Sequence, residues 1–354
     1  MTGFETDVVT REIIRGKMLA VADEMGVVVK RSSMSPVIYE VLDFACGFCD
    51  PEGQLVSQTN GITVFTGTFS IQINIILEKF RDRIAPGDIY MLNNPYEGGT
   101  HYNDVGVIKP IFVAGELFAF AITISHWTDI GGKAPGSLPA DSTEIFQEGI
   151  CFPGIHIYKA GERQEAVFEM IAHNVRIPKM ALGDLNAALA SVRIAENRCL
   201  ELCEKYGEQA VRETFRHILE TSEGVSRAAV AALPDGVYHA EDWVDGDGIT
   251  EERFPTKVEV LIEGDEVTFD FTGSSPQVQG PINCSRSALV SAVKTVFKAV
   301  VDPQSPSNEG WFRPLKVVAP DGTMFTATKP APVGWYYEGT AHASELAWKA
   351  LAPI

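Results

Sequence analysis

The sequence has no hydrophobic run long enough to span a membrane and no excess of basic residues. Its longest apolar stretch, residues 117–124, has the length of a strand, whereas a spanning helix needs about 18 to 20 apolar residues. The 29 basic residues are outnumbered by 47 acidic ones, which gives a net charge of −18. A surface this acidic repels phosphate backbones and anionic lipids, so nucleic acid and membrane are poor candidates for partners.

Targeting signals and zinc-type cysteine patterns are also missing. Residues 1–7 have neither the basic start nor the apolar core of a signal peptide. The Cys46–Cys49 pair has no second pair at the spacing of a zinc site. Cys199 and Cys203 lie four residues apart in a predicted helix, which is typical of core packing. We therefore expect all six cysteines to be reduced thiols in a cytoplasmic protein.

The common nucleotide-binding and hydrolase motifs are absent as well. Gly131, Gly132 and Lys133 are followed by Ala134 and lack the upstream glycine of a phosphate-binding loop. No Gly-x-Gly-x-x-Gly follows a predicted strand, and there is no Gly-x-Ser-x-Gly elbow for a hydrolase serine. We therefore expect neither ATP binding by a known loop motif nor a serine nucleophile.

What the chain does have is the composition of a folded protein. It has 354 residues, of which 45% are hydrophobic and 21% charged, enough to bury a large core without disulfides. Hydrophobic spacing predicts helices at 8–31, 69–82, 184–232 with a break at Gly207, and 284–300. The other segments between residues 37 and 126, apart from a loop at 93–104, have the short strand-like runs and turns of sheets, while 127–156 is irregular.

The strand-like segments fall mainly into hairpins. The clearest pairs are 105–113 with 117–126 and 257–262 with 266–271. Because hairpins outnumber any strand–helix–strand signal, we predict an α+β fold of mixed helices and mainly antiparallel sheets. The composition changes near residue 235, which suggests a first domain at 1–235, ending in long helices, and a β-rich second domain at 236–354.

Histidine and carboxylate side chains gather around one of these hairpins. His101 and Asp104 are three residues apart at the end of a Gly-Gly loop, and Asp104 opens the strand whose partner closes at His126. Antiparallel pairing brings those two ends together, so the three side chains can converge on a divalent metal. Asp129 is a spare carboxylate that can orient a ligand or act as a base. The other interpretation is a hydrogen-bonded His–Asp loop without a metal, because the spacing is common by chance.

A longer pattern surrounds this hairpin. Asn94-Pro-Tyr-Glu-Gly-Gly-Thr-His101-Tyr-Asn-Asp104 is followed by His126-Trp-Thr-Asp-Ile-Gly-Gly132, Pro135-Gly-Ser137 and Gln147-Glu-Gly149. This resembles the hydantoinase B / 5-oxoprolinase family, which includes the non-ATPase subunits of N-methylhydantoinases and related ketone carboxylases. Further matches run in order along nearly the whole chain: Glu40-Val-Leu-Asp43-Phe44, Asn174-Val-Arg176, Gly183-Asp184-Leu185, Asp270-Phe-Thr-Gly273, Gly280-Pro-Ile-Asn283 and Gly310-Trp-Phe-Arg-Pro314.

The resemblance implies a divalent metal, zinc or manganese, held by Asp43, His101, Asp104 and His126. It thus adds Asp43 to the three residues that the hairpin suggests. It also implies a partner, an actin-like hydantoinase A-type subunit that uses ATP to phosphorylate the carbonyl oxygen of a cyclic amide such as hydantoin, 5-oxoproline or another lactam. Metal-bound water on this chain is then expected to attack the activated carbon and open the ring.

Two departures from the family pattern keep alternatives open. Family members of the hydrolase type usually carry a histidine-containing segment where this chain has Gln58-Thr-Asn-Gly-Ile-Thr-Val-Phe-Thr-Gly67, without a histidine. A subunit of an ATP-dependent ketone carboxylase, of the acetone or acetophenone type, is therefore the alternative. The sequence also ends at Ile354, about a third short of the usual family length. We expect either a separate chain that supplies the rest or a shortened member, in the extreme a non-catalytic scaffold subunit.

Other residues of the pattern allow two interpretations each. Glu148 is either a carboxylate that serves the site, as a base or as support for a ligand, or a solvated loop acid. Arg176 either pairs with a substrate carboxylate or phosphate, or caps the helix that follows. Gly98 and Gly99 either let the loop approach the metal closely or form a plain turn.

Overall fold

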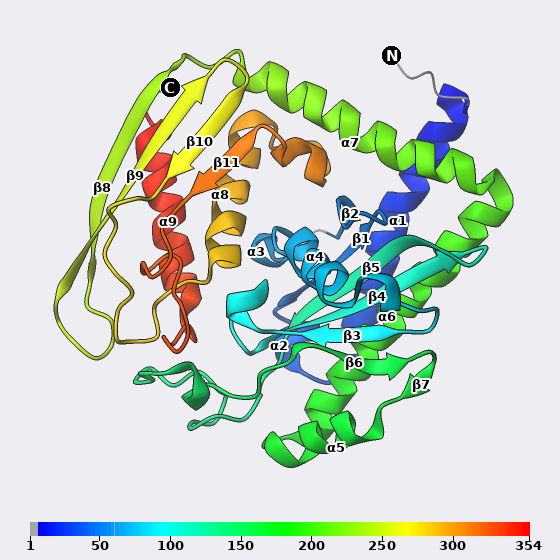
Figure 1. Cartoon of the computed structure of the whole chain (residues 1–354), viewed down its shortest axis with the longest axis horizontal. Helices are drawn as coiled ribbons and strands as arrows, with labels where there is room; N and C mark the ends of the chain where they lie inside the picture. Colours follow the sequence, from blue (N-terminus) through cyan, green and yellow to red (C-terminus); the bar gives the residue numbers. More distant parts are fainter. Residues whose placement is uncertain (1–5, 60) are drawn as a thin grey trace.

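The computed structural model describes residues 6–59 and 61–354, and it folds into two sheets with helices packed against them (Figure 1). The first sheet has seven strands in the order β2-β1-β5-β4-β3-β6-β7, all antiparallel to their neighbours. Its strands are β1 (Phe44–Cys49), β2 (Leu55–Gln58), β3 (Ile89–Leu92), β4 (Asp104–Val113), β5 (Glu116–His126), β6 (Pro153–Lys159) and β7 (Glu162–Arg163).

Helices cover both faces of this sheet. They are α1 (Val8–Ser32), α2 (Pro36–Tyr39), α3 (Thr63–Thr66), α4 (Phe69–Phe80), α5 (Glu165–Asn174), α6 (Pro178–Tyr206) and α7 (Glu208–Val230), with short 3₁₀ turns η1 (Arg81–Arg83), η2 (Pro95–Glu97) and η3 (Ile145–Gln147). Successive strand residues point to opposite faces. Val105 and Val107 of β4 therefore lie in the core with α1 and α6, while Ile108 lies in a separate core with α4. The double cover explains why β4 reads as a nearly continuous apolar strand.

The second sheet has four strands in the order β11-β10-β9-β8, with β11 parallel to β10. Its elements are β8 (Gly236–Asp245), β9 (Arg253–Glu263), β10 (Glu266–Asp270) and β11 (Leu315–Val318), with helices α8 (Arg286–Val301) and α9 (Tyr336–Leu351) and the turn η4 (Glu309–Phe312). Buried and exposed residues alternate along β9, so one face packs on the helices and the other meets solvent.

The predicted α+β class is confirmed, and most predicted elements are present. Some boundaries were wrong: the segment 37–64, predicted as strands, also contains α2 and α3, and the helix predicted from 184 begins at Pro178. Proline is well suited to the first turn of a helix, so α6 starts there instead of at Gly183. The predicted break at Gly207 is confirmed, since Gly207 has a left-handed φ of 84° between α6 and α7.

Two helices, α5 and α9, were not predicted. The buried face of α9 includes small residues such as Gly339, Thr340 and Ala343, so its apolar periodicity is weak in the sequence. The second sheet begins at Gly236, and the division into domains 1–235 and 236–354 stays a proposal. Across residues 6–59 and 61–354, the structure contains no helix that combines the length and the apolar character needed to span a bilayer.

Candidate metal centre

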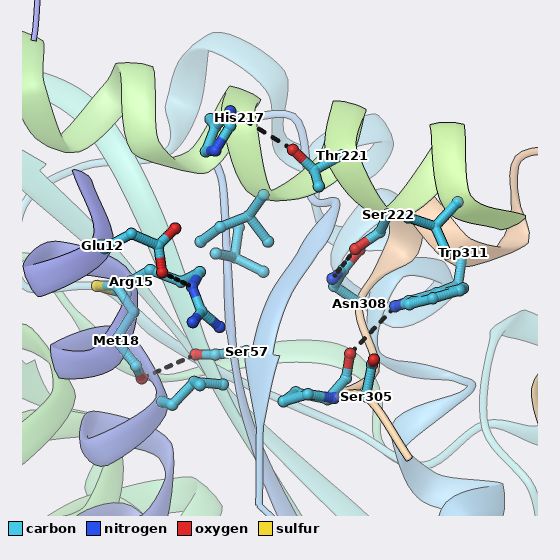
Figure 2. Close-up of a pocket in the computed structure, with 15 residues that line it drawn as sticks. Glu12, Arg15, Met18, Ser57, His217, Thr221, Ser222, Ser305, Asn308 and Trp311 are labelled. Atoms are coloured by element: carbon cyan, nitrogen blue, oxygen red, sulfur yellow. Dashed lines mark hydrogen bonds and ion pairs between the residues drawn. The ribbon is translucent and has the colours of Figure 1, made fainter. Parts of the chain in front are cut away.

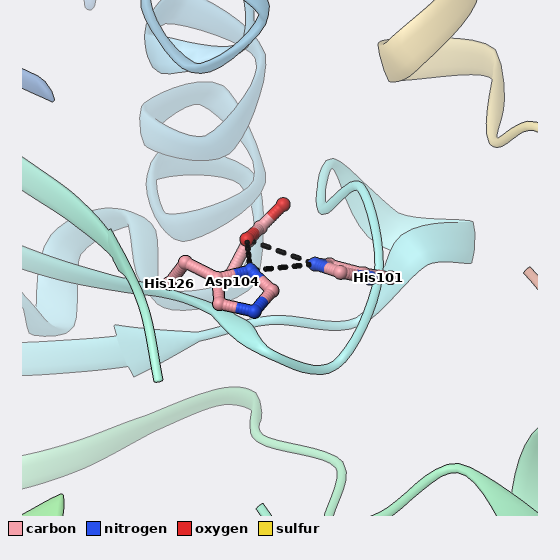
Figure 3. Close-up of side chains that lie close together, drawn as sticks. All are labelled: His101, Asp104 and His126. Atoms are coloured by element: carbon pink, nitrogen blue, oxygen red, sulfur yellow. Dashed lines mark hydrogen bonds and ion pairs between the residues drawn. The ribbon is translucent and has the colours of Figure 1, made fainter. Parts of the chain in front are cut away.

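His101, Asp104 and His126 point toward one another at the end of the β4–β5 hairpin (Figure 3). Asp104 and His126 are paired directly in the ladder. Asp104 Oδ1 lies 2.9 Å from His126 Nδ1 and 2.9 Å from His101 Nε2, and the two imidazole nitrogens are 3.2 Å apart. The hairpin therefore brings together the three side chains that its register predicted.

The distances within this trio suit a shared divalent ion. Two neighbouring ligands about 2.1 Å from an ion are about 3.0 Å apart in an octahedral site and about 3.4 Å apart in a tetrahedral one. The three observed separations lie at or near this range. Two imidazoles and a carboxylate are also the donors that zinc and manganese accept. Within the described part of the chain, no second group of three such residues has its ligand atoms this close together.

The loop that carries His101 is tightly fixed. Gly98 has a left-handed φ of 91°, and a Cβ on Gly99 would lie 2.6 Å from the carbonyl oxygen of Asn93, so both positions need glycine. The Gly99 carbonyl accepts hydrogen bonds from Ser285 and Ser287, at the start of α8. The close approach that the two glycines permit is therefore to the chain's own backbone, and it holds the loop against the second half of the chain.

Burial and charge set the electrostatics of the trio. His101 and Asp104 are almost fully buried, whereas His126 is partly exposed. Burial alone would raise the pKa of Asp104, but the charges and hydrogen bonds of His101 and His126 outweigh it and hold that pKa well below its usual range. Burial alone would lower the pKa of His101, and the facing Asp104 carboxylate raises it instead. An anion is therefore fixed at the centre of the site, as a cation site requires.

Asp43, the fourth predicted ligand, lies at the edge of this trio. Its Oδ2 is 4.0 Å from His126 Nδ1, and its carbonyl accepts the His126 backbone N–H. Burial, followed by repulsion from Asp104, raises the pKa of Asp43 to about 6. Leu42, just before it, has a left-handed φ of 64°, a conformation that costs a non-glycine residue energy and is often found at functional sites. Asp43 is thus near enough to join the trio after a small side-chain movement.

Asp129, the first carboxylate predicted for catalysis, is engaged in holding a loop. Its Oδ1 accepts hydrogen bonds from the backbone N–H groups of Gly131 and Arg176, and its Oδ2 accepts from the Gly136 N–H and the Arg176 guanidinium. Burial would raise the pKa of Asp129, but these bonds lower it. They favour a structural role for both Asp129 and Arg176 over contact with a substrate.

Glu148, the second predicted carboxylate, is buried and bonded to the segment before α9. Its Oε1 accepts from the Ser142 hydroxyl and the Gly334 N–H, and its Oε2 accepts from the Val333 N–H. The interpretation of Glu148 as a solvated loop acid is therefore wrong, because only 1% of the residue is exposed. Burial raises the pKa of Glu148, although these hydrogen bonds act against the increase.

Sequence reasoning missed three groups that contact the trio. The hydroxyls of Thr100 and Tyr336 both donate to Asp104 Oδ2, at 2.5 and 3.0 Å, and the Gly334 carbonyl lies 2.8 Å from His101 Nδ1. Thr100 adjoins His101 in the sequence and was open to discovery. No spacing rule connects Gly334 and Tyr336 to residues more than 200 positions away.

A separate cavity of about 270 Å³ lies between α1, α7 and the loop before η4 (Figure 2). Several of its polar side chains bond to one another or to nearby backbone: Glu12 to Arg15, His217 to Thr221, Asn308 to Ser222, and Trp311 to the Pro306 carbonyl. None of the trio lines it. The chemistry of the chain is therefore concentrated at the hairpin, not at this cavity.

Comparison with known proteins agrees with the site. The profile of the Hydantoinase B/oxoprolinase family matches residues 7–354, so the chain belongs to this family. The B-type polypeptide of a putative D-/L-hydantoinase from Pseudomonas sp. (strain NS671) is 34% identical over 98% of this chain and 62% of its own length. The beta-chain polypeptide of the caprolactamase from Pseudomonas jessenii is 30% identical over 92% of this chain and 56% of its own length. The chain thus spans less than two thirds of these relatives.

Two solved structures share the fold. A crystal structure of the ATP-dependent caprolactamase from Pseudomonas jessenii matches with a TM-score of 0.90 and 28% identity, over 98% of this chain and 61% of that one. A nucleotide-free acetone carboxylase matches with a TM-score of 0.92 over 99% of this chain and 48% of that one. At 18% identity, the second match shows the fold alone.

Proposed function

We propose that this chain is the metal-bearing B-type subunit of an ATP-dependent hydrolase that opens a cyclic amide such as a hydantoin, 5-oxoproline or another lactam. The observation that carries the proposal is the convergence of two imidazoles and a buried carboxylate within 3.2 Å of one another. The names of the relatives, a hydantoinase subunit and a caprolactamase subunit, support the substrate class.

In this proposal His101, Asp104 and His126 hold a zinc or manganese ion, with Asp43 as the fourth ligand. When bound, such an ion lowers the pKa of a coordinated water toward about 7 and so supplies a nucleophile at neutral pH. Asp104 provides the negative charge, and the buried position of His101 keeps bulk water from competing for that side of the ion. The partly exposed His126 and Asp43 form the side from which a substrate enters.

The proposal includes a partner, an actin-like ATPase subunit that phosphorylates the amide carbonyl oxygen. An amide resists attack at neutral pH, and a phosphate on that oxygen creates a leaving group. The sequence contains no phosphate-binding loop of its own, and the matched relatives are named as subunits. We also keep the proposed cytoplasmic location, with which the six free thiols agree.

One observation favours a second candidate, the equivalent subunit of an ATP-dependent ketone carboxylase. The segment from Gln58 to Gly67, which ends β2 and includes α3, contains no histidine. A carboxylase of this type would use the same metal site to guide an activated ketone onto carbon dioxide. A scaffold subunit without turnover is the remaining alternative.

Two measurements test these proposals. Titration of the purified chain with Zn²⁺ and Mn²⁺ should show one tight site that is lost in His101→Ala; no binding, or identical titrations, would favour the scaffold. The chain together with its co-purifying ATPase should then open 5-oxoproline, hydantoin or caprolactam in step with ATP hydrolysis. Incorporation of labelled bicarbonate into a ketone, without ring opening, would establish the carboxylase instead.

A further inference from the structure

A segment from the far end of the chain reaches the candidate metal centre. Val333–Tyr336 leads into α9, which packs on the second sheet (Figure 1). The Tyr336 hydroxyl donates to Asp104 Oδ2, and the Tyr336 ring packs edge-on against the His101 ring at 4.8 Å. The Gly334 carbonyl faces His101 Nδ1. All the proposed ligands precede residue 127, so these contacts join two distant parts of the chain.

Both sides of this segment are anchored. From the first half of the chain, Glu148 accepts the backbone N–H groups of Val333 and Gly334. From the second half, the buried Asn283 donates its amide to the Pro332 carbonyl, and the Pro281 carbonyl accepts the Trp335 N–H. Asn283 belongs to the sequence pattern of the family but had no assigned role. Its contacts show that it helps to set the position of the segment.

We propose that Val333–Tyr336 is the positioning element of the metal site, with Glu148 as its anchor and not as a general base. The inference rests on the proposed metal site and specifies which parts of the chain shape it. The Gly334 carbonyl accepts the Nδ1–H of His101 and so selects the tautomer that leaves Nε2 free for the ion. The Tyr336 hydroxyl, with Thr100, engages Asp104 Oδ2 and turns Oδ1 toward the two imidazoles.

The geometry supports each step. A neutral imidazole has one N–H and one lone pair, so a carbonyl 2.8 Å from Nδ1 requires the proton there. The other nitrogen, Nε2, is the one that faces Asp104 Oδ1 and His126. The two donors on Asp104 Oδ2 use the oxygen that points away from His126. Hydrogen bonds of this kind orient metal ligands, and their loss typically weakens metal affinity about 10- to 100-fold.

The role of Glu148 follows from its contacts. Both oxygens of this carboxylate accept from donors that do not take part in any reaction, namely two backbone N–H groups and the Ser142 hydroxyl. A Cβ placed on Gly334 would lie 3.0 Å from Glu148 Oε1, so the segment lies closely against this side chain. Glu148 therefore acts on the metal centre through Gly334 and His101.

Tyr336→Phe and Glu148→Gln test the inference, with Tyr337→Phe as the matched control. Tyr337 is the next residue, is 38% exposed and has no place in the proposed machinery. Competition titration with Zn²⁺ should show affinity about 10- to 100-fold lower in Tyr336→Phe and Glu148→Gln, and unchanged in Tyr337→Phe. Wild-type affinity in both Tyr336→Phe and Glu148→Gln would overturn the inference.

Two further readouts separate positioning from a general loss of structure. The visible spectrum of the Co²⁺-loaded protein reports coordination geometry and should change in Tyr336→Phe even where the thermal unfolding midpoint does not. In the metal-free protein, ¹⁵N NMR of labelled histidine should show His101 protonated at Nδ1, and this signal should be lost in Glu148→Gln. An Nε2-protonated His101 in the wild type would overturn the inference.

The same experiments distinguish this inference from the proposed function. If the wild type binds no metal, the proposed function fails, and the NMR readout alone decides whether the segment sets the tautomer of His101. If the wild type binds metal and the variants bind it equally well, the proposed function stands and the positioning role is rejected.

Discussion

Asp104 and His126 occupy directly opposed positions in the β4–β5 ladder, and their Oδ1 and Nδ1 atoms are 2.9 Å apart. One hairpin register therefore sets two of the three converging groups. A slip of one residue would turn one side chain to the other face of the sheet, where the core residues of α4 lie. The buried alternation along both strands protects this register, so the core stabilises the site as well as the fold.

The first prediction concerns the charge at the centre of the trio. Asp104→Asn keeps the size of the side chain but removes the negative charge, so affinity for Zn²⁺ or Mn²⁺ should fall at least about 100-fold. Calorimetric titration of the purified protein measures this. His239→Ala, at an exposed histidine in the second sheet, is the control and should bind as the wild type does. Equal affinity in Asp104→Asn would show that the trio is only a hydrogen-bonded cluster.

The second prediction separates a structural from a catalytic role for Asp129. Asp129→Ala leaves three buried backbone N–H groups and a guanidinium without their acceptor, so unfolding free energy should fall by about 2–4 kcal/mol. Urea unfolding measures the loss. Metal affinity should stay within a few-fold of wild type in conditions where the variant is folded. A fully stable variant that binds metal but has no turnover would restore Asp129 as a catalytic base.

The third prediction tests a close backbone approach in the second half of the chain. A Cβ on Gly280 would lie 1.8 Å from the Asp247 carbonyl oxygen, and the Gly280 N–H donates to the Asp247 carboxylate. Gly280→Ala should therefore destabilise the protein by about 2–3 kcal/mol in denaturant unfolding. The matched control is Gly224→Ala, in α7, where nothing lies within 4 Å of the new methyl group. That change should be neutral or stabilise by up to about 1 kcal/mol, since alanine favours helix.

The fourth prediction is a pH dependence of stability that arises from Asp50. Burial, followed by the nearby charge of Glu52, raises the pKa of Asp50 from 3.8 to about 7. Between these two values the folded state holds a proton that the unfolded state has released, so stability should fall as the pH rises from about 4 to 7. A shift of about three pKa units corresponds to an upper limit of about 4 kcal/mol.

Asp50→Asn removes this titration. Urea midpoints measured from pH 4.5 to 7.5 should fall less steeply in Asp50→Asn than in the wild type, and the variant should be at least as stable at pH 7. Asp23→Asn, at an exposed carboxylate of α1, is the control and should keep the wild-type slope. Parallel curves for Asp50→Asn and the wild type would mean that Asp50 does not carry the effect.

The amino-acid sequence was enough to predict the features that depend on neighbouring residues. Alternating apolar residues predicted the β4–β5 hairpin, and the pairing of its ends predicted that Asp104 and His126 meet. The His101 loop followed from its glycines. These features are local, because a strand alternates its side chains with a period of two and a hairpin closes within a few residues. The family pattern then pointed to Asp43 beyond the hairpin.

The surroundings of these ligands became known only from the folded chain. Glu148, Gly334 and Tyr336 meet at the site because the second half of the chain folds back on the first, and neither periodicity nor spacing records contacts more than 180 residues apart. The same holds for Asp129, whose four donors come from loop geometry. Local physics selects which side chains can bind a metal, whereas the packing of distant segments decides how they are oriented and which carboxylates remain free to react.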